Sequence, residues 1–357
     1  MLSSRFTTGR TPVTTALIGV LAAVFIACGG DDADGKRDEV QPGQPAASEA
    51  RAPKPPFARD GIWNRRLPDD SPVDPNSKAL VKTLRTQVAK EAAASSGPYV
   101  NTWQYSTPVY RVRRNQPRVK VTLDNPATYA ESLRQAISSV PIPKRARPAR
   151  GSDGHMVVYQ RSTDTMWEFW RMEKRSDGWH AKMAGRMENV SRNPGVFGGE
   201  SGFPWGATAT SLPLLGGLMR PAELRSGLIE HALALAIPAP RASTWAAPAL
   251  RTDGSASGAK AIPLGARFRL DPEVDVDKLK VSRPVKAMAR AAQRYGIVVR
   301  DTAGAVVFYG EDPSTMRRNP YPRIFGKQPL PQQLSRFPWN KLELMQMDLK
   351  TYRGSGK

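Results

Sequence analysis

The segment Gly151–His180, GSDGHMVVYQRSTDTMWEFWRMEKRSDGWH, decides the fold that the sequence predicts. Two runs rich in apolar and aromatic residues, His155–Gln160 and Met166–Met172, flank the polar run Arg161–Thr165, which suits a turn. Such a pattern predicts a hairpin. A third strand is expected over Trp179–Met187, after the Asp177-Gly178 turn.

Alternation assigns the side chains of the second strand to two faces. Met166, Glu168 and Trp170 share one face, and Trp167, Phe169 and Arg171 share the other. Because both faces carry aromatic residues, we expect one to be buried and the other to take part in binding.

The rest of the chain adds more short strands than helices. Apolar residues at helical spacing predict a helix over residues 75–94, with Asp74 as its N-cap and Pro75 at its first position. Further helices are predicted over residues 129–139, 221–227 and 284–293. Alternating runs predict strands over residues 99–105, 109–114, 119–124, 229–238, 245–249 and 266–270, and a second hairpin from 297–301 and 305–311. The expected fold is α+β and β-rich: an antiparallel β-sandwich of jelly-roll type with peripheral helices.

The N-terminus has the organisation of a secretory signal peptide over residues 1–27. Arg5 and Arg10 precede an apolar run that ends in Ala27, directly before Cys28. The sequence Phe25-Ile26-Ala27-Cys28 resembles the lipobox of bacterial lipoproteins, in which the cysteine is lipidated. This resemblance implies export and a lipid anchor through Cys28 on the extracytoplasmic face of the cell membrane.

The remaining chain is expected to form a tether and one globular domain. Residues 28–56 combine Cys28 with a Pro-, Gly- and Asp-rich stretch that has too few apolar residues to fold. The globular domain spans 57–357: an N-terminal helix and strands (57–150), a core with the candidate site (151–313) and a C-terminal wrap (314–357). The Gly- and Asn-rich run over residues 189–210 is expected to be a lid or a binding loop.

The charge favours anionic partners. There are 53 Lys and Arg against 32 Asp and Glu, a net charge of +21. Anionic lipid or a polysaccharide or other anionic polymer would suit this balance, although a solvated Arg-rich surface explains it equally well. Nucleic acid is not expected, because we find no basic stripe interleaved with aromatic residues and the chain is predicted to be exported. Cys28 is the one cysteine, which excludes internal disulfides.

The strong sequence motifs of nucleotide and zinc enzymes are missing. There is no Walker A motif, no G-x-G-x-x-G after a strand, no H-E-x-x-H and no G-x-S-x-G. No nucleotide is therefore expected as a partner, and the cofactor, if any, stays unknown.

The candidate site consists of polar residues on or beside predicted strands. His155 or His231 could act as general acid or base with Glu168 or Asp153 on a glycan. Substrate contacts are assigned to Arg267, Arg269, Trp170, Trp205 and Asp301. Two alternatives stay open: His231 could be a hydrogen-bonded core residue, and a cupin-like metal site could use the two histidines and Glu168. The spacing of these three is not a local ligand motif, so no metal site is assigned. His180 is expected to be exposed and incidental.

Several short motifs carry a family resemblance. They include Ser152-Asp153-Gly154-His155, Trp167-Glu168-Phe169-Trp170, Asp177-Gly178-Trp179-His180-Ala181, Glu230-His231-Ala232-Leu233 and Gly265-Ala266-Arg267-Phe268-Arg269-Leu270. With these, residues 151–313 resemble a family of secreted bacterial β-rich proteins without an established activity. The resemblance implies an extracytoplasmic setting and, by association, work on the envelope or on glycans.

Two functions remain in view. The first is a membrane-anchored surface lipoprotein that acts on or binds a polysaccharide, possibly an acidic one; as an enzyme it would be a glycoside hydrolase or a polysaccharide lyase. The second is a non-catalytic surface lipoprotein that binds a glycan or a partner protein. The two differ in whether a set of charged residues converges in one cleft: Asp153, His155, Glu168, Arg267 and Arg269.

Overall fold

The computed structural model describes residues 55–124, 131–198 and 205–352, and residues 51–357 form one compact unit. The signal peptide, Cys28 and most of the tether predicted from the sequence lie outside the described residues. The helices are α1 (Ser77–Ala93), α2 (Glu131–Ala136), α3 (Pro221–Ser226), α4 (Arg283–Arg294), α5 (Tyr321–Phe325) and α6 (Leu330–Ser335). No helix in these ranges is long and apolar enough to cross a bilayer.

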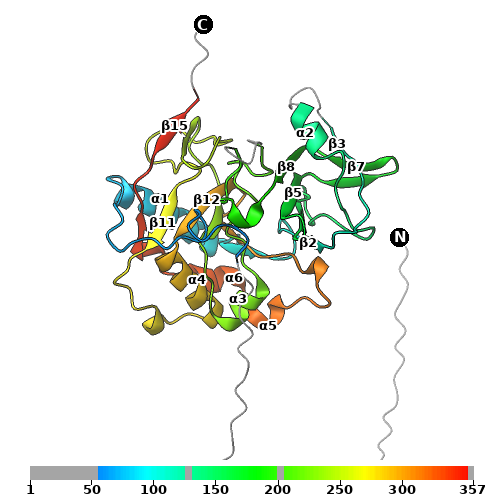
Figure 1. Ribbon diagram of the computed structural model, residues 1–357. Coiled ribbons are helices and arrows are strands. Elements are labelled where there is room, and N and C mark those ends of the chain that lie inside the picture. The colour runs from blue at the N-terminus through cyan, green and yellow to red at the C-terminus, as the bar shows by residue number, and fades with distance from the viewer. Residues whose placement is uncertain (1–54, 125–130, 199–204, 353–357) are drawn as a thin grey trace, which may run out of the picture. The chain divides into compact units, whose positions relative to one another are not determined.

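Fifteen short strands complete the described part of the chain (Figure 1). They are β1 (Tyr99–Asn101), β2 (Val109–Val112), β3 (Val121–Leu123), β4 (Met156–Gln160), β5 (Thr165–Trp170), β6 (Glu173–Arg175), β7 (Gly178–Ala181), β8 (Met183–Met187), β9 (Leu233–Ile237), β10 (Thr244–Ala246), β11 (Arg267–Leu270), β12 (Ile297–Thr302), β13 (Val307–Tyr309), β14 (Leu342–Leu344) and β15 (Leu349–Thr351). The predicted β-rich α+β class is thereby confirmed.

The strands form four sheets. A six-stranded sheet has the order β1-β13-β9-β12-β11-β14, a four-stranded sheet β2-β4-β5-β8, a three-stranded sheet β3-β7-β6, and a two-stranded sheet β10-β15. Each of the three larger sheets contains a parallel pair, such as β2 with β4 and β3 with β7. The jelly-roll sandwich is not confirmed, since its strands would all be antiparallel.

The hairpin predicted at the start of the candidate site is confirmed. Strands β4 and β5 pair antiparallel, with Val157 opposite Glu168 and Tyr159 opposite Met166. The third predicted strand is wrong in part, because the chain divides it at Lys182. Its second half, β8, pairs with β5, while its first half, β7, joins β3 and β6 in a separate sheet.

The second predicted hairpin is wrong. Strand β9 lies between β12 and β13, parallel to β12 and antiparallel to β13. Every residue of β9, LALAI, is buried. A strand that is apolar on both faces buries most surface in the centre of a sheet that is covered on both sides. This burial outweighs the tendency of β12 and β13, which are joined by a short connection, to pair with each other.

Alternate residues of the six-stranded sheet enter two different cores. Leu233, Leu235 and Ile237 pack with helices α1 and α4 on one face, while Ala234 and Ala236 enter a second core with residues of β4 and β5. A third core lies on the other face of the four-stranded sheet and includes residues of α2, β3 and β7. The molecule is therefore layered, and the four-stranded sheet is covered on both faces.

The helices follow the local sequence closely. In α1 the buried side chains Leu80, Val81, Leu84 and Val88 recur at helical spacing, and in α4 Pro284 occupies the first turn, where a missing N–H costs nothing. The acidic residue expected to cap α1, Asp74, lies two residues before the cap, and its carboxylate accepts a hydrogen bond from the Asn76 N–H at 2.8 Å.

Candidate functional site

The core between the six-stranded and four-stranded sheets contains a group of buried charged residues. Glu168 lies in the middle of β5, His155 directly precedes β4, and Arg300 and Asp301 belong to β12. Glu168 and Arg300 have no exposed surface, His155 is 2% exposed and Asp301 8%. We call His155, Glu168, Arg300 and Asp301, together with the half-buried Asp153, the buried cluster.

Glu168 holds a loop in place. Its two carboxylate oxygens accept hydrogen bonds from the backbone N–H groups of Ala207 and Leu214, both at 2.7 Å. Burial raises the pKa of Glu168 to about 7, although both hydrogen bonds act in the opposite direction. The loop and the six-stranded sheet cover this face of the strand, so neither of its two faces is open at Glu168.

Arg300 was not singled out in the sequence. It is the extra residue of a β-bulge, since the pairing of β12 with β9 shifts between Val299 and Asp301. A bulge redirects side chains, and here it allows both charged neighbours to be buried. The Arg300 guanidinium donates hydrogen bonds to Leu214 O at 2.8 Å and Gly216 O at 2.9 Å, and lies 4.2 Å from the centre of the Tyr309 ring.

Asp301 completes the attachment of the same loop. Its carboxylate accepts from the Ala209 N–H at 2.9 Å, and burial raises its pKa to about 6. The loop predicted as a lid over residues 189–210 is thus fixed at its C-terminal end by side chains of two sheets. Residues 199–204 lie outside the described parts.

His155 is buried without a hydrogen-bond partner from the described residues. Neither ring nitrogen has a hydrogen-bond partner among the described residues, and the same holds for Nε and Nη2 of Arg300. Burial lowers the pKa of His155 to about 4; Asp153 opposes this change and the charge of Arg300 adds to it. The imidazole is therefore neutral near pH 7.

His231 contacts a different set of residues from those of the buried cluster. It is 4% exposed, and its Nδ1 lies 2.8 Å from Ala232 O and its Nε2 3.3 Å from Glu223 Oε2. Burial acts to raise the pKa of Glu223, but the charges of His231 and Arg220 overcome this effect and hold it at about 2. His231 connects helix α3 to the start of β9, as expected from the core alternative.

The two arginines of β11 hold the N-terminal segment. Arg267 donates to the carbonyl oxygen of Ile62. Arg269 donates to Pro68 O at 2.8 Å and Asp69 O at 3.1 Å, and forms an ion pair with Glu343 at 3.0 Å. Their guanidinium groups are thus occupied by the protein itself.

The predicted tryptophans are partly buried. Trp170 donates from Nε1 to Asp153 Oδ1 at 3.2 Å, and Trp205 packs against the core that contains α2. The structure therefore brings Trp170 into contact with Asp153. It also places His155, Glu168 and Asp301 close enough to Arg300 for its charge to shift their pKa values. Arg267 and Arg269 of β11 bind other parts of the chain and do not belong to this group.

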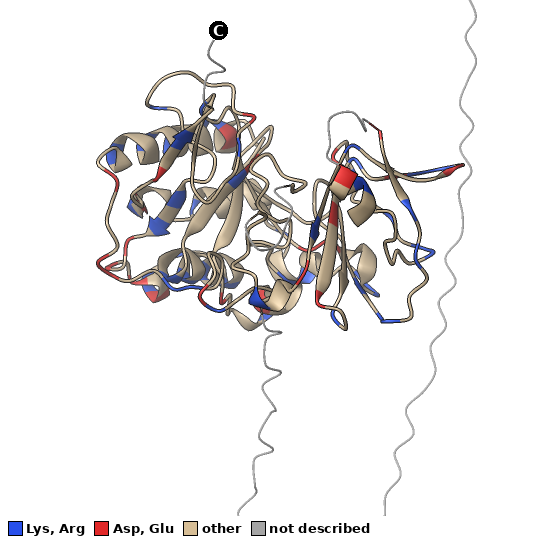
Figure 2. Ribbon diagram, turned by 45° about the horizontal axis from the view of Figure 1, so that its top comes forward, with Lys and Arg blue, Asp and Glu red and all other residues tan. Residues whose placement is uncertain are grey.

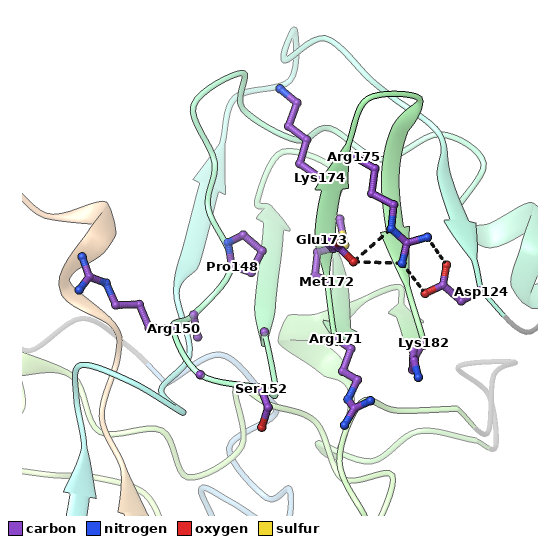
Figure 3. A pocket seen from close by; sticks show the side chains of 13 residues that line it. Asp124, Pro148, Arg150, Ser152, Arg171, Met172, Glu173, Lys174, Arg175 and Lys182 are labelled. Atoms are coloured by element: carbon purple, nitrogen blue, oxygen red, sulfur yellow. Dashed lines mark hydrogen bonds and ion pairs between the residues drawn. The ribbon is translucent and has the colours of Figure 1, made fainter.

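An open groove lies elsewhere along the segment that decides the fold. It encloses about 670 Å³ and is lined by Gly151, Ser152, Gly154, Met172 and charged residues (Figure 3). Five of these charged residues are basic and two are acidic: Arg150, Arg171, Lys174, Arg175, Lys182, Asp124 and Glu173. We call this the basic groove. Figure 2 shows Lys and Arg on several strands and loops of this part of the chain.

Three cations of the basic groove lie against tryptophan rings. The guanidinium of Arg150 lies 4.2 Å from the centre of the Trp103 ring, and that of Arg171 4.8 Å from Trp170. Lys174 Nζ lies 5.8 Å from the Trp179 ring. Each arrangement is a cation–π contact, which positions the cation without neutralising its charge.

A network of ion pairs closes one side of the groove. Arg175 donates to both oxygens of Asp124, at 2.8 and 2.9 Å, and to Glu173 at 3.0 Å. The hydrogen bond to Arg175 lowers the pKa of Asp124. His180 lies beside this network with Nδ1 3.2 Å from Asp124 and Nε2 3.1 Å from Asp177. It is 9% exposed, so the expectation of an exposed, incidental His180 is wrong.

No group of three or more His, Cys, Asp or Glu residues in the described ranges could hold a metal ion. His155, Glu168 and His231 therefore do not form the cupin-like ligand set considered from the sequence. Searches against protein-family models, curated proteins and solved structures gave no match.

Proposed function

We propose that this protein is an exported, lipid-anchored surface protein that binds an acidic polysaccharide in the basic groove without cleaving it. The observation that carries the proposal is the excess of basic side chains around an open groove, three of them supported by tryptophan rings. Guanidinium groups suit carboxylates and sulfates, which such polymers present at regular intervals.

The expected affinity comes from several weak contacts. A solvent-exposed ion pair contributes about 0.2–1 kcal/mol and is weakened by salt. A polymer that engages several cations at once adds these contributions within one complex, so binding should be moderate and should fall with ionic strength. Holding Arg171 and Lys174 over rings lowers the conformational cost of ordering them.

Burial of the acid–base candidates supports binding rather than turnover. A general acid or base must come within hydrogen-bond reach of its substrate. His155 and Glu168 are 2% and 0% exposed, and both oxygens of Glu168 are engaged by the loop. The enzymatic alternative requires this core to open.

The anchor is proposed from the N-terminal sequence. Lipidation at Cys28 would place the groove at the extracytoplasmic face of the membrane, separated from it by the stretch that ends at residue 56. Membrane fractionation of wild type and Cys28→Ala tests this part, because retention of the variant in the membrane fraction would contradict it.

The test of the groove is a binding measurement with polygalacturonate and neutral dextran at low and high salt. The double variant Arg171→Ala/Lys174→Ala should bind polygalacturonate about two- to thirtyfold more weakly, which corresponds to two lost ion pairs. The matched control Lys82→Ala/Arg85→Ala removes the same charge from the exposed side of α1 and should bind as wild type does.

Equal losses in the two double variants would contradict a specific groove. Release of reducing ends or of unsaturated products by wild type, abolished in His155→Ala, would instead support the enzymatic alternative.

A further inference from the structure

Trp103 is an exposed tryptophan beside the basic groove. Its side chain is 51% exposed, whereas Trp167 and Trp179 of the candidate segment are 2% and 6% exposed. Keeping a large apolar ring in water forgoes the stabilisation that its burial would provide. An exposed tryptophan at the edge of a groove therefore needs an explanation.

The loop that carries Trp103 is fixed to the edge of the groove. The Tyr105 N–H donates to Arg150 O at 2.8 Å, and the Asn101 side chain donates to Tyr105 O at 3.3 Å. Tyr105 also adopts a φ of +52°, a conformation that a non-glycine residue keeps only when its surroundings impose it.

The ring of Tyr105 packs against Gly151, one of the residues that line the groove. A Cβ atom at Gly151 would lie 2.6 Å from the Tyr105 ring, so this approach requires glycine. The loop around Trp103 is therefore held in a defined position relative to the groove.

One cation belongs both to the groove and to Trp103. The Arg150 guanidinium lies 4.2 Å from the centre of the indole and also lines the groove. Since the indole is about half exposed with this guanidinium in place, much of the indole stays open to solvent. An apolar surface and a fixed positive charge thus occur side by side.

We infer that Trp103 and Arg150 form a subsite for one uronic acid unit of the polymer, with the pyranose ring on the indole and the carboxylate on the guanidinium. This inference rests on the proposed function and specifies its ligand. Stacking requires a ligand with an apolar face, so the subsite selects carbohydrate polyanions over polyanions that offer charge alone.

The experiment measures binding of three polyanions, polygalacturonate, inorganic polyphosphate and single-stranded DNA, at one low salt concentration. The proteins compared are wild type, Trp103→Ala and Trp103→Phe. For Trp103→Ala we expect affinity for polygalacturonate to fall about three- to tenfold, the range for one aromatic contact, with polyphosphate unaffected. Trp103→Phe should recover part of the loss. Tyr352→Ala, which truncates a side chain that is 53% exposed, should bind as wild type does.

The remaining outcomes separate the inference from the function on which it rests. If wild type binds polygalacturonate and Trp103→Ala binds equally well, the subsite is wrong and the proposed function stands. Equal losses for both ligands would mean that the indole only positions Arg150, which also overturns the subsite. A parallel loss for single-stranded DNA would favour a nucleic-acid surface instead, since bases also stack on tryptophan. If wild type binds none of the polyanions, the proposed function itself fails.

Discussion

The buried cluster and the basic groove both concentrate charge, but their charges face different partners. In the buried cluster, Glu168 and Arg300 are enclosed by the protein, and their hydrogen bonds fix the loop from Ala207 to Gly216. In the basic groove, Arg171 and Lys174 are exposed and lie over tryptophan rings. Unusual residues in a core are thus better evidence for structure, and accessible cations with fixed positions are better evidence for binding.

The largest expected effect separates the two regions by stability. Arg300→Met should lower the free energy of unfolding by about 3–5 kcal/mol, because it leaves buried Leu214 O and Gly216 O without donors and removes the positive charge near Glu168 and Asp301. Urea denaturation measures the change. Arg171→Met in the groove is the matched control and should stay within about 0.5 kcal/mol of wild type. If both variants changed the free energy of unfolding by a similarly small amount, the distinction between a structural cluster and an accessible groove would be wrong.

The second prediction concerns pH and uses the buried histidine. The folded-state pKa of His155 is about 4, below its ordinary value of 6.5, so between these values the unfolded chain binds a proton that the folded chain does not. His155 therefore contributes stability above pH 6.5 that is lost as the pH falls towards 4.

Glu168 has the opposite effect. Its folded-state pKa is raised from 4.5 to about 7, so its contribution is present below pH 4.5 and is lost as the pH rises through 7. The two groups partly compensate between pH 4.5 and 6.5.

His155→Leu removes one side of this compensation. Between pH 4 and 6.5, the unfolding free energy of His155→Leu should fall more steeply with rising pH than that of wild type. The difference between the two slopes is at most about 1.4 kcal/mol per pH unit. Urea denaturation at several pH values measures both slopes, with His180→Leu as the control outside the core between the two large sheets. Identical slopes for wild type and His155→Leu would show that His155 titrates in the folded protein as it does in water.

The smallest effect is a gain of binding in the groove. Asp124→Asn removes the carboxylate that Arg175 contacts at 2.8 and 2.9 Å, which adds one positive charge to the lining. Polygalacturonate should bind about two- to fivefold more tightly at low salt. Asp275→Asn, which removes a carboxylate paired with exposed Lys278, is the control. Unchanged or weaker binding of the Asp124 variant would contradict an electrostatic groove.

Local features of the fold could be predicted from the sequence. Helix α1 follows from the spacing of Leu80, Leu84 and Val88, and the β4–β5 hairpin follows from two apolar, aromatic-rich runs around one polar turn. The position of β9 between β12 and β13 could not be predicted in this way, because strand order depends on which apolar surfaces meet across long sequence separations.

The basic groove borders the segment that the sequence singled out, but its charged lining residues are not the candidate residues predicted there. His155 and Glu168 attracted attention because histidines and acidic residues are rare between apolar strands, and the structure buries both. Arg300 was missed because nothing in IVVRD marks a bulge. Trp103 was missed because YVNTWQY alternates as a strand would, whereas β1 ends at Asn101. Exposure, which distinguishes these residues, depends on tertiary contacts that a single sequence does not reveal.

The pairing of β1 with β13 has a consequence for when the chain can fold. Tyr99 lies opposite Val307, so the edge of the six-stranded sheet forms only after more than 200 further residues are available. Such distant pairing makes folding slow compared with local helix formation. A chain that completes its largest sheet late stays unfolded longer after synthesis, and such a delay would suit the export that we propose from its N-terminal sequence.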